Sequence, residues 1–295
     1  MRATFLAAPL VLALVLHAAT AHAQLRLESS SSNLRYTLSD LDPGDALQPS
    51  ITLNPVNLPS LTVRGWARQG DNYLFDEYLS AWHTEATVPL APDFAPFIAI
   101  SASATGGENM ATVNGRASVD LNGTPAGTFV ELDAQSNAGA FYFELGPRSS
   151  VTFSVDLGVA MQADALGEEG YHVGSAGGWL SAGPFTWPGD YDRVEEHFWL
   201  PVGQQNDGSF IPSQAWAGTL SVTLDNPDSE ALRVGGIQFS NYVYAQVSAV
   251  PEPAPVALWL AGSLPALALA LAQARSISWR TRRRQRSRPT EYQPK

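Results

Sequence analysis

A long uncharged stretch near the C-terminus constrains this chain more than any other feature. Residues 254–272 read APVALWLAGSLPALALALA, nineteen residues without one charged side chain. A helix of that length spans about 28 Å, close to the ~30 Å hydrocarbon core of a bilayer. Pro265 is tolerated in a membrane helix, because neighbouring groups satisfy the freed backbone. The stretch therefore predicts one transmembrane helix.

The predicted helix is followed by a basic end. Its arginines are Arg275, Arg280, Arg282, Arg283, Arg284, Arg286 and Arg288. Basic residues beside a membrane span favour the cytoplasmic side. We therefore expect the C-terminus in the cytoplasm and the chain before residue 250 outside it.

The N-terminus predicts export. Met1-Arg2 supplies positive charge, residues 5–16 form an apolar core, and Ala21-His22-Ala23 forms an A-x-A cleavage site. This pattern is typical of a secretory signal peptide, here residues 1–23, which signal peptidase removes. The exported part is then residues 24–249.

A Pro-Glu-Pro sequence stands directly before the predicted helix, as Pro251, Glu252 and Pro253 after Val250. Together with the helix and the arginines, residues 250–288 resemble the PEP-CTERM sorting signal of Gram-negative bacteria. The resemblance covers about 40 of 295 residues. It implies that a membrane-embedded exosortase recognises and processes the chain near Pro-Glu-Pro. The alternative is an ordinary C-terminal anchor.

That resemblance also implies a destination. Proteins with this signal pass through the inner membrane and reach the cell surface or the extracellular matrix, where they are associated with extracellular polysaccharide and biofilm. We therefore expect a membrane intermediate with its C-terminus in the cytoplasm, followed by release to the surface.

The exported part is strongly acidic and has no cysteine. Residues 24–249 carry eight arginines, no lysine and 26 acidic residues, a net charge of −18. Such a surface repels nucleic acid, which excludes nucleic-acid binding. The absence of cysteine excludes thiol catalysis and disulfides, so a hydrophobic core of these 226 residues must stabilise the fold.

Short alternating runs separated by Gly, Pro, Asn and Asp predict an all-β fold. In residues 151–157, four apolar residues alternate with Thr, Ser and Asp. Further strands are expected at residues 34–38, 61–66, 97–103, 111–121, 141–145, 194–200, 220–224 and 237–247. Sustained helical periodicity is missing from residues 24–249. We therefore predict an antiparallel β-sandwich or jelly roll.

Three local patterns carry further expectations. Residues 24–33, rich in serine, predict a flexible lead-in, and residues 158–192, rich in Gly and acids, predict long surface loops. Asn122-Gly123 suits a type I′ turn, so residues 117–121 are expected to pair with residues 128–132 in a hairpin.

Catalytic patterns are weak. His83, His172 and His197 lie far apart in the chain, and each is interpreted as a solvent or edge-strand histidine. Gly174-Ser175-Ala176-Gly177-Gly178 lacks the spacing of a serine nucleophile elbow and is interpreted as a flexible loop. Paired carboxylates remain open, because only spatial distance defines them. We predict a protein that is not an enzyme, with a secreted hydrolase as an alternative.

Two kinds of binding site are considered. Calcium favours oxygen ligands, and Asp40, Asp42 and Asp45 lie in one turn, although the EF-hand pattern is missing. A second acidic group is Asp190, Asp192, Glu195 and Glu196. Solvated turns are the alternative for both.

Aromatic residues concentrate in the second half of the exported part. Exposed Trp and Tyr can stack on sugar rings, so the carbohydrate-binding candidates are Trp179, Trp187, Tyr191 and Trp216. The alternative is that they fill the core. Two functions are therefore predicted: a non-catalytic surface protein sorted by an exosortase and associated with polysaccharide, or a carbohydrate-binding β-sandwich module.

Overall fold

The computed structural model describes residues 24–56, 59–82, 87–106, 109–125, 127–164, 170–183 and 193–248. The chain divides into two compact units, Met1–Val250 and Pro251–Lys295. All described residues lie in the first unit, and the fold below is the fold of that unit.

The described residues form two antiparallel sheets and one 3-10 turn, η1 (Met110–Thr112). Sheet A has the order β13 (Ser213–Asn226), β9 (Ser149–Ala163), β1 (Gln24–Asp40), β7 (Asn114–Asn122), β6 (Ile98–Thr105) and β5 (Thr87–Leu90). Sheet B has the order β12 (Phe210–Ile211), β11 (Val194–Gln204), β10 (Tyr171–Gly183), β14 (Arg233–Ser248), β8 (Thr128–Leu145), β3 (Ser60–Gln69) and β4 (Asn72–Trp82), and β2 (Ile51–Val56) pairs with β8. The predicted all-β class with antiparallel sheets is confirmed.

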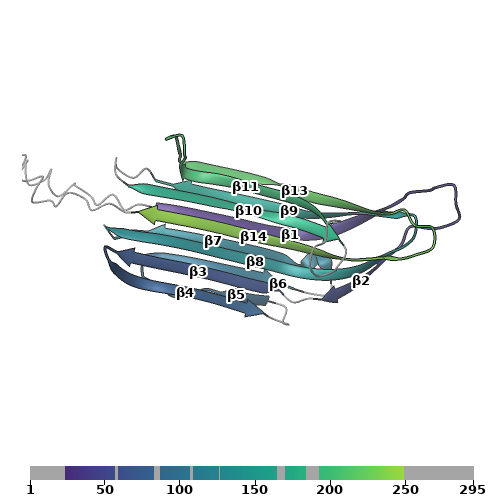
Figure 1. Ribbon diagram of the computed structural model, residues 1–295, viewed down its shortest axis with the longest axis horizontal. Helices are drawn as coiled ribbons and strands as arrows, with labels where there is room; N and C mark the ends of the chain where they lie inside the picture. The colour runs from purple at the N-terminus through teal and green to yellow at the C-terminus, as the bar shows by residue number, and fades with distance from the viewer. Residues whose placement is uncertain are drawn as a thin grey trace, which may run out of the picture. The chain divides into compact units, whose positions relative to one another are not determined.

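The two sheets pack face to face around one hydrophobic core. Strand β1 contacts β10 and β14, β7 contacts β14 and β8, and β13 contacts β11. The axes of the long strands in the two sheets are roughly aligned (Figure 1). The largest fully buried side chains are Phe141, Phe143, Phe153 and Phe239. A buried phenylalanine contributes about 3–5 kcal/mol when compared with alanine, so these rings hold the sheets together without disulfides.

Strand β9 shows why the sequence forms this arrangement. Val151, Phe153, Val155 and Leu157 are buried, and the residues between them face outward. Successive side chains of a strand point to opposite faces, so this alternation gives the strand one apolar and one polar face. The burial predicted for residues 151–157 is confirmed.

The serine-rich start of the mature chain is a central strand, which corrects the expected flexible lead-in. Ser29 and Ser31 lie in β1 and point into the core. The Ser29 hydroxyl donates to the carbonyl oxygen of Gly177 at 2.6 Å, and the Ser31 hydroxyl donates to the side-chain oxygen of Asn241. The Asn241 amide donates in turn to Ser29 at 3.0 Å. Serine is tolerated there because both hydroxyls are hydrogen-bonded across the sheets.

The region predicted to form long loops, residues 158–192, contains the last six residues of β9 and all of β10. Strand β10 lies between β11 and β14, and it includes the run Gly174–Gly178. A Cβ on Gly178 would lie 2.8 Å from a Leu157 methyl carbon, and one on Gly174 would lie 2.8 Å from Leu27. The glycines are needed for close approach of the two sheets, so the loop expectation is wrong for residues 158–163 and 171–183.

The hairpin predicted at Asn122-Gly123 is also wrong. Strand β7 pairs with β1 and β6 in sheet A, whereas β8 belongs to sheet B. A type I′ turn needs positive φ at both central residues, and among the described residues that are not glycine only Asn33 and Arg148 have positive φ. Both strands carry inward apolar residues, so they face each other across the core and the connection crosses between sheets.

Candidate functional site

Several predicted residues lie outside the described residues. These are Val250, Pro251, Glu252, Pro253, the arginines from Arg275 to Arg288, the span 254–272, His83, Trp187, Asp190, Tyr191 and Asp192. In the part of the chain that the structure describes, no helix has the length and hydrophobicity that a membrane crossing needs.

Trp216 packs between the sheets. It lies in β13, is partly buried against the core, and stacks on Phe198 of β11 with ring centroids 3.8 Å apart and an interplanar angle of 22°. Its position matches the structural alternative, in which a large aromatic residue fills the core. Trp216 is also among the residues that line a shallow groove on sheet A, together with Gly158, Ala160, Ala215 and Ala217.

Trp179 lies on the outer face of sheet B and is covered by charged neighbours. The Arg193 guanidinium lies 5.2 Å from its ring centroid, and the His197 ring stacks at 6.3 Å. Glu195 joins the two, because one of its carboxylate oxygens contacts Arg193 Nε and the other contacts His197 Nε2, each at 2.9 Å. Trp179 is therefore half-buried within an ion-pair cluster, and its ring is less available to a ligand than the sequence suggests.

The outer face of sheet B, the side that points away from the core, carries the three most exposed aromatic residues of the described chain. Trp199 is 58% exposed, Tyr78 is 64% exposed and Tyr73 is 71% exposed. Trp66, Phe129, Tyr242 and Tyr244 have outward positions on the strands between them and are half-buried. These aromatic residues lie on β11, β14, β8, β3 and β4, which are five of the six neighbouring strands from β11 to β4.

The strand register places these rings in rows across the sheet. Tyr242 pairs with Gly177, which pairs with Trp199, so no side chain stands between the two rings. Neighbouring strands lie about 4.8 Å apart, so the Cα atoms of Tyr242 and Trp199 are about 10 Å apart. Trp66 stacks on Phe129 with ring centroids 4.7 Å apart. The rows form a broad aromatic surface of half-buried and exposed rings.

Two carboxylates of β8 lie within this aromatic surface, and Asp76 of β4 lies opposite Trp66 at its edge. Asp133 pairs with Tyr244 on one side and with Arg64 on the other, and Arg64 pairs with Tyr78. Glu131 lies two residues before Asp133 and therefore on the same face. Burial raises the pKa of Asp133, Arg64 opposes this rise, and Glu131 adds to it.

Burial shifts the pKa of both outward tyrosines of β14, and the carboxylate charges act on Tyr244 as well. Burial raises the pKa of Tyr244, and the charges of Glu131, Tyr171 and Asp133 add to that rise. Burial alone raises the pKa of Tyr242. Both phenols therefore stay protonated over the physiological pH range and can donate hydrogen bonds.

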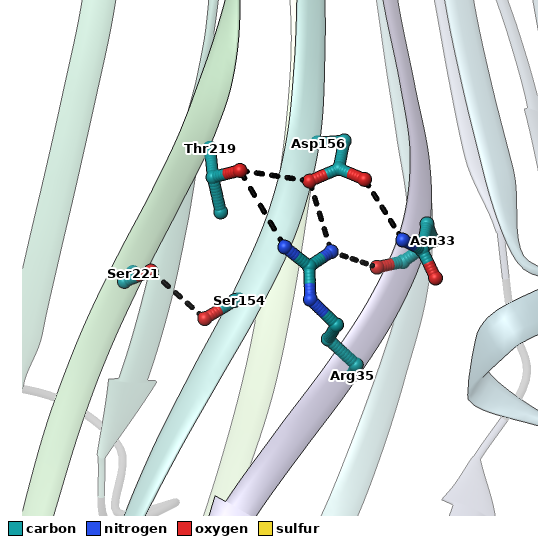
Figure 2. Close-up of polar contacts among 6 residues, drawn as sticks. All are labelled: Asn33, Arg35, Ser154, Asp156, Thr219 and Ser221. Atoms are coloured by element: carbon teal, nitrogen blue, oxygen red, sulfur yellow. Dashed lines mark hydrogen bonds and ion pairs between the residues drawn. The ribbon is translucent and has the colours of Figure 1, made fainter.

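The outer face of sheet A is different in character. Here Thr152 contacts Thr223, and Ser154 contacts Ser221, each pair with its hydroxyl oxygens 2.8 Å apart. Figure 2 shows the Ser154–Ser221 pair and, one step further along β9, a polar cluster around Asp156. Small hydroxyl side chains paired across strands satisfy one another, which is a structural use of these residues.

The Asp156 cluster is held by a break in β1. Asn33 has φ 57, and the register of β1 against β9 shifts between Ser32 and Arg35. Asn33 Nδ2 donates to one Asp156 oxygen at 2.8 Å, and Arg35 Nη1 and Thr219 Oγ1 donate to the other at 2.9 and 2.8 Å (Figure 2). The hydrogen bond from Asn33, followed by those from Thr219 and Arg35, lowers the pKa of Asp156. Both carboxylate oxygens of Asp156 therefore accept hydrogen bonds within the protein.

The three calcium candidates, Asp40, Asp42 and Asp45, accept hydrogen bonds from the backbone of the turn in which they lie. Asp40 accepts from the backbone N–H of Asp42 at 2.9 Å, Asp42 from Gly44 at 3.3 Å, and Asp45 from Leu47 at 2.7 Å. These are Asx-turn contacts, in which the carboxylate stabilises the local backbone. Within the described residues, no three His, Asp or Glu side chains gather in a metal-binding arrangement. Calcium binding at this turn stays a prediction.

The two described histidines differ. His197 is exposed in β11, as predicted. His172 is 1% exposed in β10 and contacts Phe210 with ring centroids 5.6 Å apart, which corrects the expectation of a solvent or edge-strand histidine. Neither of its ring nitrogens has a hydrogen-bond partner within the described structure. Burial lowers the pKa of His172, and Asp164 opposes this.

The sequence contained a signal for part of this surface. In residues 241–247, Tyr242 and Tyr244 alternate with apolar residues that are buried in the core. Alternation alone therefore assigns both tyrosines to the outer face. Which strands lie beside them depends on the sheet order, which no local pattern contains.

Comparisons with known proteins give no family to place beside this geometry. No family model, no curated protein and no solved structure matches the chain. Function is therefore argued from the surface itself, whose aromatic rings and hydrogen-bond donors suit the flat apolar faces and hydroxyl edges of sugars.

Proposed function

We propose that this chain is an exported, non-catalytic surface or matrix protein that binds extracellular polysaccharide through the outer face of sheet B. The observation that carries the proposal is the set of outward aromatic residues on sheet B, in which Trp199 shares a row with Tyr242, and Tyr78 shares the next row with Tyr244. An exposed row of large rings in a monomer is usually a binding surface. A sugar chain offers the matching chemistry, since each ring stacks on a pyranose face.

In this proposal, the two chain ends carry the signals for export and sorting. Residues 1–23 act as a signal peptide, residues 24–249 form the β-sandwich ectodomain, and residues 250–288 form a sorting signal that an exosortase recognises at Val250–Pro253. The helix 254–272 anchors the intermediate in the inner membrane, and the arginines keep its C-terminus in the cytoplasm. Described strand β14 ends at Ser248, two residues before this signal.

Binding is tested by sedimentation of the full chain, kept soluble in detergent, with insoluble polysaccharides such as cellulose and chitin. We expect the protein in the pellet, and we expect Trp199→Ala with Tyr78→Ala to leave it in the supernatant. Phe75→Tyr is a matched control, because Phe75 stacks on Phe94 beneath the same strand. A double variant that sediments like the unaltered protein refutes the binding face.

Two further experiments address catalysis and sorting. Incubation with soluble polysaccharide is expected to release no new reducing ends, and their release would identify a hydrolase. Replacing Pro251, Glu252 and Pro253 with alanine is expected to leave the full-length chain in the inner membrane of its host. Unchanged processing of that variant would contradict the sorting proposal.

A further inference from the structure

We propose that the polysaccharide bound by sheet B carries free amino groups, and that Glu131 and Asp133 bind these ammonium groups between Trp66, Tyr78 and Tyr244. This inference rests on the proposed function and names its ligand class. We call these five residues the carboxylate strip. The ligand class is a polymer of amino sugars from which some acetyl groups have been removed.

The strip is built by strand register. Asp133 lies directly opposite Tyr244 of β14, and Glu131 lies directly opposite Trp66 of β3. Directly opposite residues on one face have Cβ atoms about 4.5–5.5 Å apart. Each carboxylate therefore has an aromatic ring as its immediate neighbour. A ring that stacks on a sugar face places the substituents of that sugar next to the carboxylate.

Glu131 and Asp133 lack the close ion pair that several carboxylates on the outer faces make. Ion pairs of 2.9 Å join Glu28 to Arg116, Asp156 to Arg35, and Glu195 to Arg193. No such pair involves Glu131 or Asp133 among the described residues. The neighbouring cations are engaged differently: Arg68 lies over the Phe129 ring at 5.7 Å, and Arg64 acts on Asp133 without an ion-pair contact.

The environment of Asp133 favours an incoming cation. Its carboxylate is half-buried, and burial raises its pKa; Arg64 opposes that rise, and the repulsion from Glu131 adds to it. An ammonium group placed between the two carboxylates would relieve both the repulsion and the desolvation. The adjacent rings add cation–π attraction, which is strongest for tryptophan.

The negative charge of the exported part also favours a ligand with free amino groups. With a net charge of −18 over residues 24–249, the protein repels polyanions such as uronic-acid polysaccharides. A neutral polysaccharide gains only stacking and hydrogen bonds at this face. A polymer with free amines gains the electrostatic attraction as well, so it is the ligand that the face complements best.

The test compares polymers that differ only in acetylation. The full chain in detergent is sedimented with chitosan and with the same chitosan after chemical re-acetylation, in about 0.1 M and about 1 M salt. The Debye length falls from ~10 Å to ~3 Å over that range. We expect chitosan to bind at least about tenfold more tightly at low salt, and the difference to disappear at high salt.

The deciding variant combines Glu131→Gln and Asp133→Asn, which keep the shape and remove the charges. We expect it to bind chitosan at least about tenfold more weakly and to bind the re-acetylated polymer as before. Glu144→Gln, on the same strand β8 but outside the strip, is the control and is expected to bind like the unaltered protein. Thermal unfolding of each variant verifies that the fold is retained.

The outcomes separate this inference from the proposed function. Equal binding of both polymers, or a double variant that still prefers chitosan, overturns the inference and leaves polysaccharide binding standing. Failure to bind any polysaccharide refutes the proposed function itself. Polylysine serves as a polycation without sugar rings. If the double variant loses affinity for chitosan but binds polylysine as tightly as the unaltered protein does, the strip is specific for amino sugars and the proposal is supported. If the double variant loses affinity for both polymers, the surface binds polycations in general and the proposal is contradicted.

Discussion

Gly177 offers a sharp test of the fold, because alanine at this position has no room. A Cβ there would collide with the carbonyl oxygen of Phe198 and would lie 2.8 Å from the Cα of Trp199. Both atoms belong to the backbone of β11, which pairs with β10 along ten residues and cannot turn aside as a flexible side chain can. We expect Gly177→Ala to lower the free energy of unfolding by about 3 kcal/mol, the upper part of the range for overpacking.

The assay is thermal or urea unfolding of the full chain in detergent. For a domain of this size, about 3 kcal/mol lowers Tm by about 6–12 °C. Gly44→Ala is the matched control, since the nearest atom to its Cβ is an Asp42 oxygen at 3.5 Å, an ordinary contact. That control is expected to change stability by less than about 1 kcal/mol. If Gly177→Ala unfolds together with the control, residues 174–178 are the loop that their composition suggests, and the structure of β10 is wrong.

Three further predictions concern buried groups. Burial holds the folded pKa of His172 below its unfolded value of about 6.5. The stabilisation from neutral His172 is therefore complete above about pH 6.5 and is lost as the pH falls toward the folded pKa. Between about pH 7.5 and about pH 5.5, the free energy of unfolding should therefore change less for His172→Leu than for the unaltered protein. Asn241→Ala removes the partner of Ser29 and Ser31 and should cost about 1–3 kcal/mol by urea unfolding, whereas Ser221→Ala on the surface should cost less than about 0.5; equal losses would argue against a buried network. In urea unfolding, Trp216→Ala should destabilise the protein by about 2–4 kcal/mol, because Trp216 packs against the core. Trp199→Ala should weaken polysaccharide binding in sedimentation and leave stability nearly unchanged, because Trp199 is exposed. The reverse pattern would show that Trp199 is structural and that Trp216 binds the ligand.

The alternation of apolar and polar residues along a strand predicted part of the fold correctly. In β9, Val151 to Leu157 alternate strictly, and their burial follows from strand geometry alone. The same rule places Tyr242 and Tyr244 outside. Such inferences succeed because each needs only the period of a single strand.

Tertiary contacts decided the rest. Ser29 and Ser31 resemble a flexible lead-in until Asn241, more than 200 residues away, completes their hydrogen bonds. Gly177 resembles loop composition until β11 approaches it. The carboxylate strip is likewise invisible in the sequence, since Trp66 and Glu131 meet only through the order β14-β8-β3.

The most direct test of the account is the intact mass of the mature protein recovered from its native host, in membrane and extracellular fractions. Exosortase processing predicts a species that starts at Gln24 and ends near Pro251 to Pro253, free or with an added mass, in the surface or extracellular fraction. A species that still carries Arg288 and occurs only in the membrane would contradict it, and would identify the protein as a plain anchored ectodomain.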